Sequence, residues 1–153
     1  MHPSVVFTNN GIVAEFFELK DLPVDVKWVA APAFEVLTAA KAAIHQGAVL
    51  QSNPLAGIRT SQPLFSHPAK PPSGDTGRHS RISSVNPYLS VLTSQMQDAV
   101  DFASVQSISE AMSVYKKSGR LRYMSHGEEA IRAFQNADLE TLLATIAYVT
   151  QKT

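Results

Sequence analysis

Polar side chains able to bind a ligand follow three short apolar segments of this chain, near residues 8, 52 and 94. The candidate binding residues are Thr8, Asn9, Asn10, Ser52, Asn53 and Ser94. If the three segments are neighbouring parallel strands, their hydroxyl and amide groups meet at one sheet edge, beside helix N-termini with free backbone N–H groups. A carboxylate or a phosphate would bind there. The alternative is that these residues only form turns and cap helices.

Arg59 is the candidate counter-charge for such an anion. It ends a polar, turn-rich segment, 51–59, which directly follows the apolar residues 48–50. A planar guanidinium can hold a carboxylate or a phosphate through two parallel hydrogen bonds. The sequence therefore predicts an anion site at the edge that carries Arg59, with Asn9 and Asn53 brought to that edge by adjacent strands.

Patterns that would indicate catalysis, a metal or a cofactor are missing from the sequence. The chain has no cysteine, and its five histidines, at 2, 45, 67, 79 and 126, are never three or four residues apart. The glycine patterns of phosphate-binding loops do not occur. Ser52 with His45 as its base would need an activating motif that is absent here, and His45 is better placed to interact with helix carbonyls. We therefore predict no catalytic residue, no metal ligand and no cofactor.

Composition predicts one globular domain over residues 1–153, because 44% of the residues are apolar and 17% are charged. Lys and Arg number 13, and Asp and Glu also number 13, so there is no basic surplus for binding nucleic acid. No apolar run approaches the roughly 20 residues of a membrane span, and the first residues lack the pattern of a signal peptide. We expect a cytoplasmic protein that binds neither nucleic acid nor membranes.

The first third of the chain alternates between strand and helix patterns. Alternating or β-branched apolar residues predict strands, and apolar residues at helical spacing predict helices, with Gly47 as the residue that follows a helix end. The predicted strands are 5–8, 24–29 and 48–50, and the predicted helices are 12–17 and 32–46.

Residues 53–87 are rich in Pro, Gly, Ser and basic residues and lack periodic apolar positions. A connection of this length predicts a long loop or insertion that serves as a lid, binds a ligand or is disordered. Residues 66–83 are the part that we expect to be peripheral to the core. Four basic residues make this segment locally positive and able to attract an anion, although such segments are more often only solvated. They are Lys70, Arg78, His79 and Arg81.

The last part of the chain predicts one strand, at 88–92, and three helices. Asp101 can cap the first helix, Ser125 and Glu128 form a capping box for the second, and Asp138 can begin the third. Strands that alternate with helices indicate parallel pairing through right-handed crossovers. We therefore predict a three-layer α/β sandwich with a mostly parallel, four-stranded, Rossmann-like sheet.

Three segments of the chain resemble the GrdX family, across residues 4–117. They are Thr8-Asn9-Asn10, Ile44-His45-Gln46-Gly47 with 49–57, and 100–111. The most specific part is Asn53-Pro54-Leu55-Ala56-Gly57, where the family has a His-Pro-Leu-Ser-Gly-like run. GrdX proteins are small proteins encoded among the glycine reductase genes of anaerobic bacteria that ferment amino acids, so the resemblance implies that setting and no defined mechanism.

These observations favour a non-catalytic accessory or regulatory protein of amino-acid fermentation, associated with glycine reductase. It would bind a small anion or a protein partner near Asn9, Asn53 and Arg59. One alternative is a small enzyme for a carboxylate or phosphate substrate, in which Arg59 binds and His45 or an Asn polarises the substrate. Another is a structural interaction module whose exposed helix face forms a homodimer. A strongly shifted pKa in a buried pocket would favour the enzyme.

Overall fold

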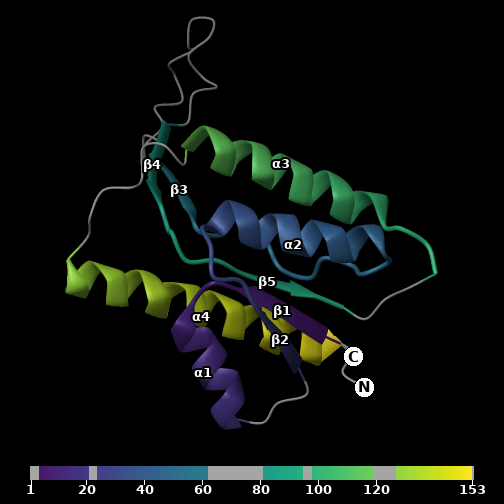
Figure 1. The fold of residues 1–153 in the computed structure, drawn as a ribbon, viewed down its shortest axis with the longest axis horizontal. Helices are drawn as coiled ribbons and strands as arrows, with labels where there is room; N and C mark the ends of the chain where they lie inside the picture. Colours follow the sequence, from purple (N-terminus) through teal and green to yellow (C-terminus); the bar gives the residue numbers. More distant parts are fainter. Residues whose placement is uncertain (1–3, 21–23, 62–80, 95–97, 119–126, 153) are drawn as a thin grey trace, which may run out of the picture.

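The computed structural model describes residues 4–20, 24–61, 81–94, 98–118 and 127–152. The chain forms, in order, β1 (Ser4–Thr8), α1 (Gly11–Lys20), β2 (Val24–Trp28), α2 (Ala33–His45), β3 (Ile58–Ser61), β4 (Arg81–Val85), β5 (Ser90–Thr93), α3 (Phe102–Ser118) and α4 (Glu128–Lys152) (Figure 1). None of the helices in the described part of the chain is long and apolar enough to cross a bilayer.

Three strands form the main sheet, in the order β2-β1-β5. β1 pairs in parallel with β2, where Val6 lies opposite Val26, and antiparallel with β5, where Val6 lies opposite Leu92. β3 and β4 pair with each other in a separate two-stranded antiparallel sheet. The predicted four-stranded, mostly parallel, Rossmann-like sheet is therefore wrong, because the observed sheet is smaller and mixed.

The direction of β5 follows from the route by which the chain reaches it. Parallel neighbours need a crossover, usually a helix, that returns the chain to the end from which it started. α1 is such a crossover between β1 and β2. Between residues 51 and 90, the described chain contains β3 and β4 but no helix, so it enters β5 at the sheet end where residue 51 leaves. β5 consequently runs against β1.

Residues 48–50, which the sequence predicts to be a strand, lie along the outer side of β5. Among the described residues they form one ladder bridge, between Leu50 and Thr93. At the next position along β5, Leu92 N donates a hydrogen bond of 2.9 Å to the side-chain Oγ of Ser52. A side-chain acceptor replaces the backbone acceptor at this point, so the pairing does not extend into a strand.

The segment predicted as a loop or insertion, 53–87, contains both strands of the second sheet. Ile58 lies opposite Val85 near the base of the pair, and β-branched residues along both strands favour extended backbone. Most of the predicted peripheral insertion lies outside the described residues, as do Lys70, Arg78 and His79, whereas Arg81 begins β4.

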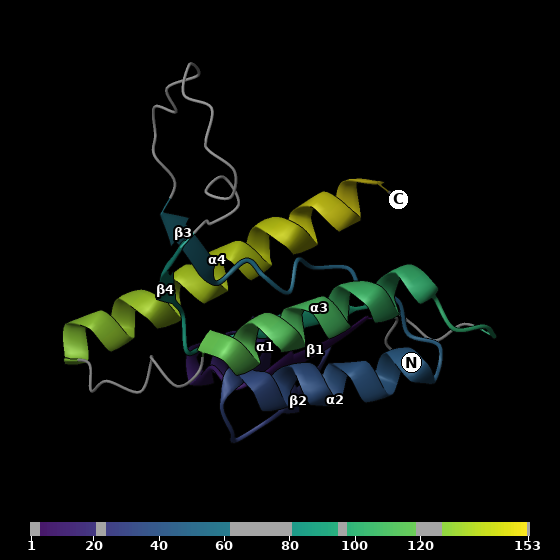
Figure 2. The same cartoon turned by 90° about the horizontal axis from the view of Figure 1, so that it is seen from above.

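The larger apolar core lies between the sheet and α2, with α3 packed against α2. Seen from above, α2 and α4 lie on opposite sides of β1 (Figure 2). Phe7 and Val91 enter the core from the sheet, and α3 contributes Ile108. The buried residues of α2 are Ala33, Val36, Leu37, Ala40 and Ile44.

A smaller apolar core lies on the other face of the sheet, where α1 and α4 pack against each other. Its buried members are Val6, Val13, Phe17, Leu92 and Leu142. α4 is one continuous helix where the sequence predicts two, and Asp138 does not begin a helix but lies within α4. Its carboxylate is bonded to residues of β5 and of the α1 N-terminus, so it caps no helix of its own.

Local signals mark the starts of α1 and α3 and the end of α2, whereas α1 runs three residues beyond its predicted end, to Lys20. Asn10 Oδ1 accepts a hydrogen bond of 3.1 Å from Ile12 N at the start of α1. Asp101 Oδ2 accepts one of 3.1 Å from Ser104 N, which confirms the predicted cap of α3. Gly47 follows the end of α2 with a φ of 118°, a conformation that side chains disfavour.

Candidate binding pocket

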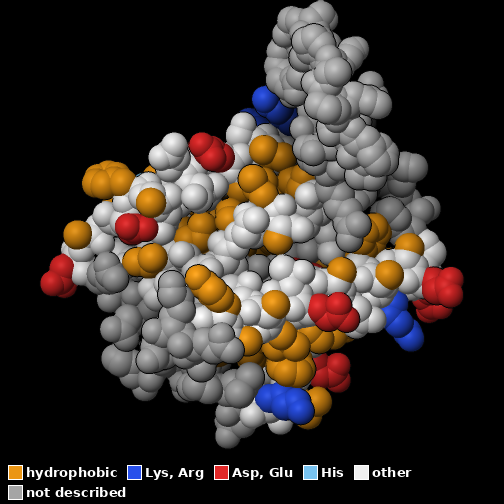
Figure 3. All heavy atoms as spheres, turned by 180° about the vertical axis from the view of Figure 1, so that it is seen from behind, with side chains coloured by type: hydrophobic (Ala, Val, Ile, Leu, Met, Phe, Trp, Pro, Cys, Tyr) orange, Lys and Arg blue, Asp and Glu red, His pale blue; other side chains and the backbone are white. Residues whose placement is uncertain are grey.

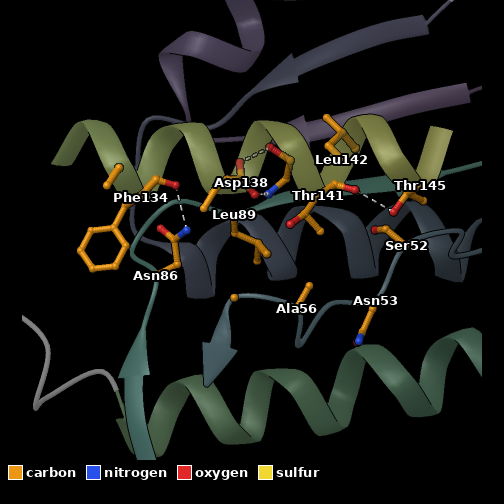
Figure 4. A pocket seen from close by; sticks show the side chains of 14 residues that line it. Ser52, Asn53, Ala56, Asn86, Leu89, Phe134, Asp138, Thr141, Leu142 and Thr145 are labelled. Carbon is orange, nitrogen blue, oxygen red and sulfur yellow. Dashed lines mark hydrogen bonds between the residues drawn. The ribbon is translucent and has the colours of Figure 1, made fainter. Parts of the chain in front are cut away.

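A pocket of about 520 Å³ lies between α4 and two segments that face it, 52–57 and 86–90. Thr141 projects toward the pocket from α4, and Ala56 faces it from the opposite wall (Figure 4). Hydrophobic side chains gather on both sides of a hollow on this face of the molecule (Figure 3). The lining residues are Ser52, Asn53, Ala56, Gly57, Asn86, Leu89, Ser90, Ala133, Phe134, Ala137, Asp138, Thr141, Leu142 and Thr145.

Asp138 provides the only carboxyl group among these lining residues, and its side chain is 9% exposed. Its Oδ1 accepts a hydrogen bond from Ser90 N at 3.1 Å. Its Oδ2 accepts two, from Ser90 Oγ at 2.6 Å and from Asn10 Nδ2 at 3.0 Å. One side chain of α4 is thereby joined to the start of β5 and to the residue that caps α1.

Two hydroxyl groups extend this network into the sheet. Thr8 Oγ1 lies 2.8 Å from Ser90 Oγ and accepts a hydrogen bond of 3.0 Å from Asn10 N. Ser90 Oγ donates its one proton to Asp138 Oδ2, so in its bond with Thr8 it is the acceptor and Thr8 Oγ1 donates. The network thus has one direction, from the backbone of Asn10 through both hydroxyls to the carboxylate. Such aligned hydrogen bonds polarise one another.

Burial raises the pKa of Asp138 above its ordinary value of 3.8, while the hydrogen bonds from Ser90 and Asn10 oppose that rise. Burial dominates because transfer from water penalises the charged form. Oδ2 already accepts two hydrogen bonds, but Oδ1 accepts one from the described residues. A carboxylate oxygen has two lone pairs, so Oδ1 has an acceptor site left for a ligand.

Side chains of the pocket walls also join α4 to the loops. Asn86 Nδ2 donates to the backbone oxygen of Phe134 at 2.9 Å, and Asn86 Oδ1 accepts from Tyr88 N at the same distance. Ser52 Oγ accepts from Leu92 N and gives its own proton to none of the described residues. The pocket therefore has hydrogen-bonded walls and polar groups that remain able to bind.

Tyr115, on α3, lies close to the pocket wall. A Cβ atom at Gly57 would come within 3.2 Å of both the Tyr115 hydroxyl and Asn86 Cβ, so glycine permits this close approach. The hydroxyl is buried and has no hydrogen-bond partner among the described residues. Burial, followed by the charge of Asp138, raises the pKa of Tyr115, so this hydroxyl stays protonated at neutral pH.

The described lining residues include no Lys, Arg or His. In the described part of the chain, no group of three or more His, Cys, Asp or Glu side chains is arranged to hold a metal. His45, the alternative base, is the exposed last residue of α2, and the other four histidines lie outside the described residues. Asp138 therefore determines the electrostatics of the pocket.

Four of the residues predicted from the sequence lie in or beneath the pocket. Ser52 and Asn53 line it, and Thr8 and Asn10 belong to the network of Asp138. β1 and the segment before Ser52 are not adjacent, because β5 lies between them. Asn53 Oδ1 accepts from Leu55 N at 2.9 Å and its side chain points away from α4, as in the turn-forming alternative (Figure 4).

The side chain of Asn9 is bonded to backbone groups of nearby turns, and Asn9 is not among the residues that line the pocket. Its Nδ2 donates to Ala31 O at 3.0 Å and to Pro87 O at 3.1 Å, and its Oδ1 accepts from Leu89 N at 2.9 Å. These three bonds join the chain after β1 to the residues after β2 and to those before β5. The role of Asn9 in this structure is to position β5.

Ser94 and Arg59 do not join the other predicted residues. Ser94 follows the far end of the antiparallel β5, where its N donates to Val49 O at 2.8 Å, because the reversed direction of β5 exchanges its two ends. Arg59 lies in β3 opposite Ser84, and its side chain is outside what the structure describes. The predicted meeting of three strand ends at one edge therefore does not occur.

Sequence reasoning missed Asp138 and Ser90 as site residues. A signal for Asp138 exists, because it is four residues from Leu142 and therefore on the same helix face, where an acidic residue is unexpected. Ser90 occupies an apolar strand and gives no comparable signal. Its role depends on pairing with Thr8, 82 residues earlier in the chain.

Comparison with protein-family models, with curated proteins and with solved structures gives no significant match to this chain. The resemblance to the GrdX family stays a prediction.

Proposed function

We propose that this protein is a non-catalytic binding protein for a small molecule, which occupies the pocket beside α4. Its ligand carries a hydrogen-bond donor for Asp138 and an apolar body for the walls formed by Ala133, Ala137 and Leu142. The observation that supports this function most directly is a buried carboxyl group, with an acceptor site left on Oδ1, in a pocket of about 520 Å³. Pockets that bind small molecules combine apolar walls with few polar groups in this way.

The charge of the pocket favours a neutral or cationic ligand over the anion expected from Arg59. Among the described lining residues, Asp138 is the one that ionises. An anion would be repelled by its carboxylate, whereas an ammonium group would stabilise the ionised form and lower its raised pKa. An alkylammonium ion or a primary amide carries a hydrogen-bond donor for Asp138 and has no negative charge.

The resemblance to the GrdX family implies a setting for such a binding protein. In that setting it acts as an accessory protein of amino-acid fermentation, beside glycine reductase. Amino acids themselves carry an ammonium group, so the ligand class proposed for the pocket is compatible with this setting. The proposed binding depends on the pocket and not on this setting.

The test compares three probes that each contain six carbon atoms in a linear chain and differ in the polar end: hexylammonium, hexanamide and hexanoate. A ligand that binds the folded state raises the melting temperature by mass action. We expect hexylammonium and hexanamide to raise the melting temperature and hexanoate to leave it unchanged. Calorimetric titration of the stronger probe then gives its affinity for the wild type and for variants of α4.

Asp138→Asn should weaken hexylammonium binding by about tenfold to a hundredfold, the range for loss of one hydrogen bond to a charged group. Glu140→Gln is the matched control, because it removes the same charge from an exposed position on the same helix. It should bind like the wild type. Stabilisation by hexanoate alone, or equal affinities of Asp138→Asn and the wild type, would contradict the proposal.

A further inference from the structure

β2 forms one edge of the main sheet, so one side of its backbone has no strand beside it among the described residues. Figure 1 shows it at the margin of the sheet, on the far side of β1 from β5. Of its five residues, Asp25, Lys27 and Trp28 are exposed, and Trp28 is 53% exposed. Natural proteins usually protect such an edge, because its free backbone groups can pair with another chain.

The hydrogen bonds of β1 identify which residues of β2 face outward. Val29 N donates to Thr8 O at 2.8 Å, so the backbone groups of Val29 point toward β1. In a strand, these groups alternate from one side to the other with each residue. The backbone groups of Val24, Val26 and Trp28 therefore point away from β1 and are positioned to pair with a further strand.

We propose that a second copy of this chain adds its own β2 to this edge, antiparallel, with the two-fold axis at Val26. Val26 then exchanges both of its backbone hydrogen bonds with Val26 of the second copy. Val24 pairs in the same manner with Trp28 of the second copy, and Trp28 with its Val24. The two three-stranded sheets become one continuous sheet.

Charge complementarity selects this register. With the axis at Val26, Asp25 lies opposite Lys27 of the second copy, and Lys27 lies opposite its Asp25. These are non-hydrogen-bonded pairs, whose side chains approach each other more closely than those of hydrogen-bonded pairs. Moving the axis by one residue places Asp25 opposite Asp25, or Lys27 opposite Lys27, and shortens the overlap. The strand is complementary to itself only in the proposed register.

The same register gives the exposed tryptophan an apolar neighbour. Trp28 is placed opposite the half-buried Val24 of the second copy, which packs against the smaller apolar core. Aromatic residues opposite β-branched residues stabilise antiparallel strands. This interface is separate from the proposed binding function, because the pocket lies beside α4 and β5 while β2 is the opposite edge of the sheet.

Charge reversal tests the register directly in the full chain by sedimentation equilibrium. Asp25→Lys and Lys27→Glu each create like-charge pairs across the two-fold axis, and each should raise the dimer dissociation constant about tenfold or more. An equimolar mixture of the two variants restores opposite charges at every pair. We expect the mixture to form a one-to-one dimer with an affinity close to that of the wild type.

Val26→Pro tests the backbone pairing without altering charge. It removes an outward N–H group that gives no hydrogen bond to β1, and edge strands tolerate proline at such positions. The variant should keep the helical circular dichroism of the wild type and sediment as a monomer. A monomeric wild type, a dimer that survives Val26→Pro, or a mixture that stays monomeric would overturn the proposal. None of these outcomes bears on amine binding in the pocket.

Discussion

On one side of the β2-β1-β5 sheet, α2 packs through the larger apolar core, whereas on the other side α4 combines a smaller apolar contact with the hydrogen bonds of a buried carboxyl group. α2 buries Val36, Leu37 and Ile44 completely, together with two alanines. α4 is longer, yet among its described side chains only Asp138 and Leu142 are buried. The two helices cover the same sheet by different means.

This difference explains why the pocket lies beside α4. Close apolar packing leaves few voids larger than a water molecule. A helix held by the hydrogen bonds of Asp138 and by Asn86 needs no such continuous contact, and space remains between it and the loops. Apolar packing on the α2 side stabilises the fold, and polar attachment on the α4 side leaves room for a ligand.

Truncation of the buried apolar residues should have the largest effect and should separate the two faces. Ile44→Ala is expected to lower the free energy of unfolding by about 4 kcal/mol, since it leaves a cavity in the larger core. Leu142→Ala should cost about 2 kcal/mol, because its cavity can relax beside the pocket. Urea unfolding followed by circular dichroism measures both values. If Leu142→Ala lowered the free energy of unfolding as much as Ile44→Ala or more, the α2 and α4 sides would not differ in the way proposed here.

Removal of the carboxyl group should have the next largest effect. Asp138→Ala leaves the donors of Ser90 and Asn10 without an acceptor, and we expect it to lower the free energy of unfolding by about 3 kcal/mol. Glu140→Ala, at an exposed position on α4, should change stability by about 0.5 kcal/mol or less. If both variants unfold at the same urea concentration, α4 is not held by Asp138.

The pH dependence of stability should be the smallest of these effects, but its direction follows directly from the raised pKa of Asp138. Burial raises the pKa of Asp138 in the folded protein above 3.8, so between 3.8 and the raised value the folded state binds more protons than the unfolded state. The contribution of this group is therefore full below 3.8 and is lost as the pH rises through the raised pKa.

The measurement is urea unfolding of the wild type and Asp138→Asn over a range of pH. Asparagine has the shape of aspartate but does not titrate in this range, so the difference between the two proteins isolates the carboxyl group. We expect the wild type to gain stability relative to Asp138→Asn as the pH falls toward 4. A relative loss on acidification would mean that the hydrogen bonds from Ser90 and Asn10 outweigh burial.

Sequence patterns predicted those parts of the structure that depend on residues close to each other in the chain. The helix that ends before Gly47 and the helix capped by Asp101 follow from short-range signals. The direction of β5 does not, because it depends on the path of a connection without described helices. The resulting reversal separated Ser94 from Thr8 and made a parallel sheet the wrong expectation.

The candidate site residues divide in the same manner between those that short-range signals locate and those that they do not. Thr8, Asn10 and Ser52 follow apolar segments, so their positions at the ends of those segments could be predicted. Asp138 could not be connected with them, because its hydrogen bond with Asn10 spans 128 residues of the chain. Only the folded structure shows which carboxyl group lies beside Ser90.

The antiparallel β5 also has a consequence for the order of folding. β1 can pair with β2 after a short crossover, but its other side must wait for β5, whose Thr93 bonds to Val5 across 88 residues. Contacts between such distant residues form only after a long loop has closed, and this slows folding. During synthesis, the first four elements therefore emerge with one side of their central strand unpaired. Until β5 arrives, that side of β1 is open to pairing with the wrong strand.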